Sequence, residues 1–241
     1  MNRTALLLAA ALLAGLPLSA TAQSISKVNG TVEVAAGQTI DDISTVNGAV
    51  NVAANAVVKG DVTVVNGAIS IQDGARVGDV SAVNGGVEAG ARLTANDVST
   101  VNGAIHLGTG ARINKDVSSV NGEILLKSGS SVGGDVSTVN GAIGLIGTQV
   151  NGDVESINGN TTVGVNSVVN GGITYQAPKG ISFSFNKKRR VPTVIVGPHA
   201  QVKGDLRFER EVKLYVHSTA KVGKITGATA VAYSTDRAPT P

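Results

Sequence analysis

The chain has 241 residues, of which 42% are hydrophobic and only 2% aromatic, with no cysteine and a formal net charge of +3. Its length allows one elongated domain or two small globular ones. The lack of cysteine excludes disulfides, thiolate metal sites and a cysteine nucleophile. Because so few aromatic side chains are present, the composition favours a narrow core of Val, Ile, Leu and Ala over an ordinary globular core.

Residues 1–22 have the features of a secretory signal peptide. Arg3 supplies a positive charge, an apolar run follows from Ala5 to Leu18, and Ala20-Thr21-Ala22 matches the small-x-small cleavage pattern. We therefore predict cleavage before Gln23 and a periplasmic or secreted protein. No later apolar stretch approaches the length of a membrane-spanning helix, so we expect no transmembrane segment in the mature chain.

A Val/Ile-Asn-Gly motif recurs eight times at a spacing of 18 or 19 residues. A second motif follows in phase, a small residue and an aliphatic residue and then, in most copies, Gly-Asp-aliphatic. So constant a period is the signature of a repeat architecture. The asparagines of the first motif are Asn29, Asn47, Asn66, Asn84, Asn102, Asn121, Asn140 and Asn158.

One period, residues 97–116, illustrates the expected coil. Residues 97–101, 104–107 and 111–113 each alternate or are β-branched, which predicts three short strands. The Asn102-Gly103 pair supplies the first corner, since both residue types tolerate positive φ. Gly108-Thr109-Gly110 and Asn114-Lys115 supply the other two corners. Each period is therefore predicted to form one three-sided coil.

Equivalent strands one period apart would stack at about 4.8 Å, which predicts an all-β, three-sided parallel β-helix. About ten coils of 18–19 residues would make a rod roughly 50 Å long. Helical repeats are excluded by the Asn-Gly pair and the β-branched residues in every period. The alternation of 18 with 19 residues breaks the strict six-residue rhythm that left-handed hexapeptide acyltransferases need.

Stacking would bring identical side chains into columns along the rod. We expect the eight asparagines to hydrogen-bond as a structural ladder, with a row of ligand-binding amides as the alternative. A hydroxyl column precedes the corner and is either a solvated strand face or a flat binding row. Its members are Ser44, Thr63, Ser81, Ser99, Ser118 and Ser137.

The repeat divides the mature chain. Residues 23–175 form the repeat body, 176–193 a basic and aromatic insertion, 194–230 the last coils, and 231–241 a disordered tail. The body carries seven Lys/Arg against thirteen Asp/Glu, whereas residues 176–241 carry twelve against four. The insertion is a candidate interaction patch for phosphates, anionic lipid or acidic polysaccharide, with a solvated loop tip as the alternative. The patch consists of Phe183, Phe185, Lys187, Lys188, Arg189 and Arg190.

The coil pattern of the last coils resembles that of the bactofilins. The resemblance lies in Gly197, Pro198, Ala200, Val202, Gly204, Asp205 and Leu206, together with the earlier Ala-x-Val-x-Gly-Asp-Val copies. Bactofilins are polymer-forming cytoskeletal proteins with a right-handed, three-sided β-helix. The resemblance implies a right-handed β-helix and end-to-end assembly without nucleotide. The export signal and the regular Val-Asn-Gly corner depart from that family.

No residue pattern points to catalysis, a metal or a cofactor. His106, His199 and His217 lie in different repeats and phases, without an HExxH motif or a pair at ligand spacing. A recurring aspartate column could in principle act on glycosides, but a carboxylate repeated in every coil is typical of turn chemistry. The column consists of Asp61, Asp79, Asp97, Asp116, Asp135 and Asp153.

These observations predict a non-catalytic structural or scaffold protein of the cell envelope. We expect it to associate with itself end to end, or to bind polysaccharide or another anionic envelope component. Nucleic-acid binding is not expected for an exported chain without a recognition motif. Two alternatives stay open: a carbohydrate-active β-helix enzyme, and a surface adhesin that uses the Ser/Thr column.

Overall fold

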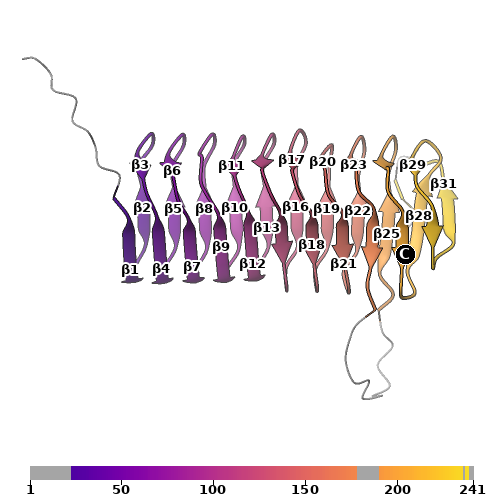
Figure 1. Ribbon diagram of the computed structural model, residues 1–241, viewed down its shortest axis with the longest axis horizontal. Helices are drawn as coiled ribbons and strands as arrows, with labels where there is room; N and C mark the ends of the chain where they lie inside the picture. Colours follow the sequence, from indigo (N-terminus) through magenta and orange to yellow (C-terminus); the bar gives the residue numbers. More distant parts are fainter. Residues whose placement is uncertain (1–22, 178–189, 236, 239–241) are drawn as a thin grey trace, which may run out of the picture.

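The computed structural model describes residues 23–177, 190–235 and 237–238, and these residues form a parallel β-helix (Figure 1). Strands follow one another in groups of three around the rod, and each strand pairs in parallel with its equivalent one coil away. Sheets 1 and 2 have eleven strands each, close to the ten coils predicted. Within the described residues, no helix is long and apolar enough to cross a membrane.

Sheet 1 contains the strand that precedes the Asn-Gly corner in the first eight coils, and the equivalent strand of the last three. Its members are β1 (Ile25–Asn29), β4 (Ile43–Asn47), β7 (Val62–Asn66), β9 (Val80–Asn84), β12 (Val98–Asn102), β15 (Val117–Ser119), β18 (Val136–Thr138), β21 (Val154–Ser156), β24 (Ile173–Tyr175), β27 (Leu206–Phe208) and β30 (Ile225–Thr226).

Sheet 2 contains the strand that follows this corner. Its members are β2 (Val32–Val34), β5 (Val50–Val52), β8 (Ile69–Ile71), β10 (Val87–Ala89), β13 (Ile105–Leu107), β16 (Ile124–Leu126), β19 (Ile143–Leu145), β22 (Thr161–Val163), β25 (Thr193–Val196), β28 (Lys213–His217) and β31 (Ala230–Tyr233).

Sheet 3 closes the coils with two-residue strands. It is interrupted at Arg76, which forms single β-bridges to Val57 in the coil before it and to Thr94 in the coil after it. Its members are β3 (Thr39–Ile40), β6 (Val57–Val58), β11 (Thr94–Ala95), β14 (Arg112–Ile113), β17 (Ser131–Val132), β20 (Gln149–Val150), β23 (Val168–Val169), β26 (Gln201–Val202) and β29 (Lys221–Val222).

Alternation along each strand fills the core. In β13, Ile105 and Leu107 are fully buried, whereas His106 between them lies on the outer face, as predicted. The interior is therefore a set of stacked aliphatic columns that exclude water, which is the main stabilising term. Larger rings enter only near the C-terminal end, where the Tyr175 and Phe208 centroids lie 5.8 Å apart.

The glycine of the Asn-Gly corner was predicted to provide a positive φ, but at most corners it is required by close backbone packing. Only at Gly30 and Gly67, among the corner glycines, does φ lie in the positive region. At Gly103 a Cβ atom would instead collide with the carbonyl of Gly85 in the preceding coil, and at Gly122 with the carbonyl of Gly103. The corners stack so closely that backbone approaches backbone, and only glycine fits there.

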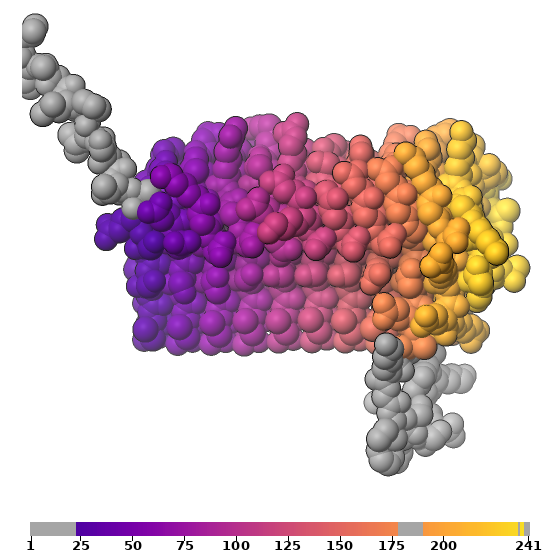
Figure 2. All heavy atoms as spheres, in the orientation of Figure 1, coloured from indigo at the N-terminus to yellow at the C-terminus, as the bar shows by residue number. Residues whose placement is uncertain are grey.

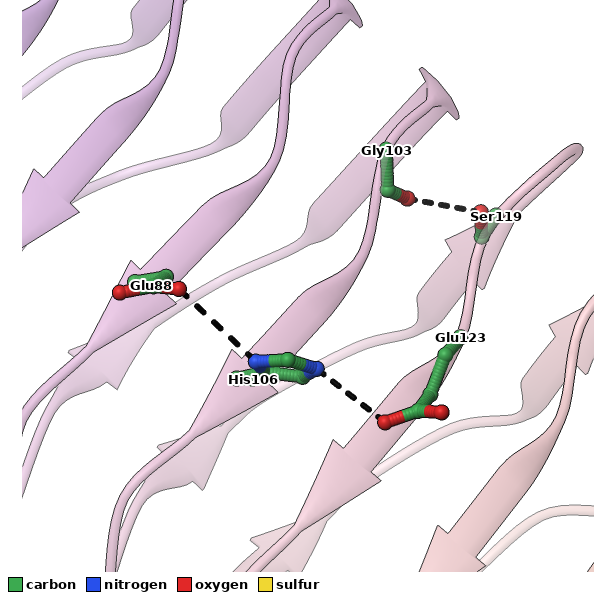
Figure 3. A network of polar contacts seen from close by, with 5 residues as sticks. All are labelled: Glu88, Gly103, His106, Ser119 and Glu123. Atoms are coloured by element: carbon green, nitrogen blue, oxygen red, sulfur yellow. Dashed lines mark hydrogen bonds and ion pairs between the residues drawn. The ribbon is translucent and has the colours of Figure 1, made fainter.

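Buried hydroxyls tie sheet 1 to the same corners. Thr100 donates to the Gly85 carbonyl at 2.9 Å, and Thr138 donates to the Gly122 carbonyl at 3.2 Å. Ser119 makes the equivalent bond to Gly103 at 3.4 Å (Figure 3). Each bond satisfies a polar group that faces the core, and it holds the corner against the next coil.

The described residues place the domain boundaries as follows. The predicted signal peptide, residues 1–22, lies outside them, as do residues 178–189 of the predicted insertion. Sheet 1 reaches Tyr175 before that segment and sheet 2 resumes at Thr193, so residue 193 belongs to a coil. The predicted tail begins too early, because β31 pairs with β28 and includes residues 231–233 in the last coil.

Candidate functional site

The eight asparagines of the repeat form one continuous ladder along an edge of sheet 1. The Nδ2 group of each asparagine after Asn29 donates to the Oδ1 atom of the asparagine one coil earlier, at 2.8–3.1 Å. Strand register brings them level, for example Asn84 beside Asn102. Each amide uses one donor and one acceptor site in the ladder, so its remaining sites face outward. The predicted ladder is confirmed.

Arg210 closes the C-terminal end of this ladder. Its Nη1 atom donates to Asn158 Oδ1 and to the Ile157 carbonyl, both at 2.6 Å. Between the coil of Asn158 and that of Arg210 lies the coil whose corner is replaced by the insertion. The Nη2 atom of Arg210 also lies 3.5 Å from the carbonyl of Arg190, at the point where the chain returns to the rod.

The hydroxyl column lies on the outer face of sheet 1, in register from coil to coil. Ser81 and Ser99 are close enough to hydrogen-bond at 3.1 Å. A second column, of valines, lies between the hydroxyls and the asparagine ladder. Its members Val46, Val83, Val101 and Val120 are each 40% exposed.

We call the outward side chains of coils two to seven of sheet 1 the Ser-Val face. It consists of Ser44, Thr63, Ser81, Ser99, Ser118 and Ser137 with Val46, Val65, Val83, Val101, Val120 and Val139. The same pair of residue types recurs through six coils without a charged member. The next coil replaces the hydroxyl with Glu155, which is level with Ser137.

The other two outer faces vary from coil to coil. On sheet 2 the register aligns Glu88 with Ser70 on one side and with His106 on the other, and His106 with Leu125. On sheet 3, Arg112 lies between Thr94 and Ser131. Of the three outer faces, therefore, only that of sheet 1 carries the same residue types through many coils.

Most of the aspartate column acts in turns. Asp135 Oδ1 accepts the backbone N–H of Asp153 at 2.7 Å, and Asp116 Oδ1 accepts that of Asp135 at 2.8 Å. Burial, with the neighbouring charges of Asp79 and Asp116, raises the pKa of Asp97. Because four of the six carboxylates accept a backbone N–H of the next coil, turn chemistry accounts for most of the column.

The three histidines do not meet. His106 lies between two glutamates on the outer face of sheet 2 (Figure 3). Its Nε2 atom is 3.2 Å from Glu123 Oε1, and its Nδ1 atom is 3.9 Å from Glu88 Oε1. His217 packs edge-on against Tyr233 at 5.0 Å. Across residues 23–177, 190–235 and 237–238, no group of three or more His, Asp or Glu could hold a metal.

Of the predicted interaction patch, Phe183, Phe185, Lys187, Lys188 and Arg189 lie outside the described residues, and only Arg190 is placed. Arg190 and Pro192 border an open depression of about 310 Å³, whose other lining residues come from the corners at Asn140 and Asn158. A second depression, of about 200 Å³, lies at the C-terminal end of the Ser-Val face beside Glu155 and Gln176.

Two features escaped the sequence analysis. The valine column was detectable, since a valine or isoleucine precedes every repeated asparagine and strand alternation turns it outward. The Arg210 contact had no local signal, because Arg210 lies 52 residues from Asn158. Comparison with protein-family models, with curated proteins and with solved structures found no match for this chain.

Proposed function

We propose that this chain is a non-catalytic scaffold rod of the cell envelope that associates with itself end to end. The observation that carries the proposal is the state of the end coils. In the part of the chain that the structure describes, β1, β2 and β3 pair only with the second coil, and β29, β30 and β31 pair only with the coil before them. Unpaired edges of parallel sheets are templates for further strands.

The two ends have the geometry for head-to-tail growth. Every pairing between coils is parallel, so the first coil of one copy can continue the sheets that end in the last coil of another. At the C-terminal end, Ala230 and Ala232 occupy inward positions of β31 and are nevertheless exposed, because no coil of the described residues covers them. A following copy would bury these side chains.

Export supports a role in the envelope. The predicted signal peptide directs the chain out of the cytoplasm, and a stack of coils held by backbone and amide ladders needs neither disulfide nor nucleotide. The uniform coils favour a mechanical role over catalysis, since most of their recurring carboxylates hydrogen-bond in turns. The bactofilin resemblance agrees with polymer formation.

An edge-blocking variant tests end-to-end association. In β2, Val32 N donates to Ala49 and Val34 O accepts from Ala53, so the peptide N–H of Glu33 between them points away from the second coil. Glu33→Pro removes that donor from the open end without removing a hydrogen bond between coils. Glu33→Ala is the matched control, because both variants lose the contact from Asn51 to Glu33.

The measurement is light scattering and electron microscopy of the mature chain from Gln23. Wild type and Glu33→Ala should form end-to-end oligomers or filaments, and Glu33→Pro should remain a single rod with an unchanged circular-dichroism spectrum. A wild-type protein that stays monomeric at every concentration, with no affinity for envelope polysaccharide, would contradict the proposal.

A further inference from the structure

We propose that two copies of this chain pack side by side through their Ser-Val faces in an antiparallel, two-fold arrangement. This inference extends the proposed scaffold role from rod ends to rod sides, and it concerns different residues. The composition of this face is unusual for a surface exposed to water.

An unbroken row of exposed aliphatic side chains indicates a surface that binds a partner. Scattered exposed valines are normal on a protein surface, but a contiguous apolar strip indicates an interaction site. The valine column is such a strip, and four of its six members, Val46, Val83, Val101 and Val120, are 40% exposed. Figure 2 shows side chains gathered into straight rows along the rod, as stacked coils of one register require.

The occupant must match the spacing of the coils. Successive valines are about 4.8 Å apart, because that is the separation of hydrogen-bonded strands. A second copy has this spacing by construction, so its columns stay in step over the whole length of the face. Two flat sheets can then pack at about 10 Å with interdigitating side chains.

The two-fold axis of an antiparallel pair lies in the interface, along the strand direction. With the valine columns of both copies in contact along the centre, rotation by 180° about this axis places hydroxyl column against hydroxyl column and asparagine ladder against asparagine ladder. A hydroxyl both donates and accepts, and an amide within the ladder keeps one N–H and one acceptor site free, so each column can hydrogen-bond to its equivalent in the other copy. Apolar contacts lie inside and polar contacts at the rim, as in protein interfaces.

Charge selects the antiparallel orientation. The eighth coil carries Glu155 on this face, and two coils later the equivalent position is Arg207. In a parallel pair the two Glu155 side chains would lie in the same layer of the interface, and so would the two Arg207 side chains, which is unfavourable. In the antiparallel pair centred between Val83 and Val101, the six uncharged coils overlap fully, and Glu155 lies opposite the first coil of the partner.

The contact is small for one pair of rods. Six coils at about 4.8 Å and five residues at about 3.3 Å cover roughly 475 Å² per copy, below the roughly 800 Å² per partner of stable complexes. A single pair should therefore be transient. Rods joined end to end would present the face repeatedly, and multiple weak contacts would then hold neighbouring filaments together.

Disulfide trapping tests the arrangement, because the chain has no cysteine of its own. In the proposed pair Val46 of one copy faces Val139 of the other, whereas the two Val46 residues are about five coils, or roughly 24 Å, apart. Mixing Val46→Cys with Val139→Cys under mild oxidation should give the mixed dimer in at least tenfold excess over either homodimer. Adding Val101→Lys to both should abolish it, and adding Val165→Lys, at a 46% exposed turn outside the face, should not.

The Glu33→Pro background separates this inference from the proposed function. Trapping of the mixed dimer in that background, where ends cannot join, would support lateral packing whatever the fate of end-to-end growth. Predominant Val46–Val46 dimers, equal yields of all combinations, or no dimer would overturn the inference. So would binding to insoluble polysaccharide that Val101→Lys abolishes while cross-linking remains random, since the face would then serve a polymer.

Discussion

Arg210 donates two hydrogen bonds at 2.6 Å, one to the Oδ1 atom of Asn158 and one to the Ile157 carbonyl, and so ends the asparagine ladder. The ladder has a direction, since every amide donates toward the N-terminal end. Its last acceptor is therefore left open at Asn158, next to the coil that carries the insertion. A guanidinium satisfies that acceptor across the gap with a charge-assisted hydrogen bond.

Replacing Arg210 with methionine should loosen the corner at Asn158. The variant keeps the aliphatic stem but loses both hydrogen bonds, which should cost about 1–2 kcal/mol of unfolding free energy. Urea unfolding measures the free energy, and hydrogen exchange should show faster exchange of the amides at residues 156–160. The control is Arg207→Met, because Arg207 is more exposed and its side chain, among the described residues, hydrogen-bonds only to Asp205. Equal effects of the two variants would contradict the capping role.

Asparagine-to-aspartate substitutions should depend on position in the ladder. Asn102→Asp leaves a carboxylate facing Asn84 Oδ1, because the donor is lost, and should cost about 1–3 kcal/mol. Asn29 needs only to accept from Asn47 in the described part of the ladder, which a carboxylate does equally well. Asn29→Asp should therefore change the unfolding free energy by less than about 0.5 kcal/mol. Chemical denaturation of the two variants compares them directly.

The stability of the rod should fall at high pH because of Tyr175. Burial raises the pKa of its hydroxyl to about 12, although hydrogen bonds, the first of them with Thr161, lower it in part. The folded protein then holds this proton above pH 10, where an unfolded tyrosine loses it. The contribution is complete below pH 10 and should decline by up to about 1.4 kcal/mol per pH unit as the pH rises toward 12.

Tyr175→Phe isolates this effect. At neutral pH the variant should lose about 1–2 kcal/mol, because the Gly159 carbonyl and Thr161 lose a buried partner. Above pH 10 the difference between wild type and variant should shrink, as measured by urea unfolding at several pH values. Tyr215→Phe, at a half-exposed position on the outer face of sheet 2, serves as the control. A difference that stays constant from pH 8 to pH 12 would refute the assignment.

Corner glycines should tolerate no side chain. Gly103→Ala places a Cβ atom against the Gly85 carbonyl, and the resulting shift should cost about 1–3 kcal/mol. Gly144→Ala is the matched control in a strand, where a Cβ atom would meet only the flexible end of Leu125 at 2.9 Å. That variant should be neutral or stabilising by about 0.4–1 kcal/mol. Thermal unfolding of both proteins checks the prediction.

The periodic part of the fold was predictable because it is local. The Val-Asn-Gly spacing, the alternation around His106 and the turn residues together predict three strands per coil, and the structure confirms them. The constant period also places equivalent residues of successive coils level with each other, so it predicts the asparagine column and the Ser/Thr column. A column of identical residues follows directly from stacking equal coils, so no tertiary information beyond the repeat was needed.

Only the tertiary structure decides the contacts between neighbouring coils and the contacts where the repeat is interrupted. The sequence indicates a glycine at each corner, but only the stacked backbone shows that the carbonyl of the preceding coil excludes a side chain there. The sequence likewise contains Arg210, but only the structure shows that its side chain reaches Asn158 past the intervening coil, whose corner the insertion replaces. The repeat determines which residues share a column, because its period is local. Which atoms touch across a gap depends on how closely the coils stack and where the stacking is interrupted.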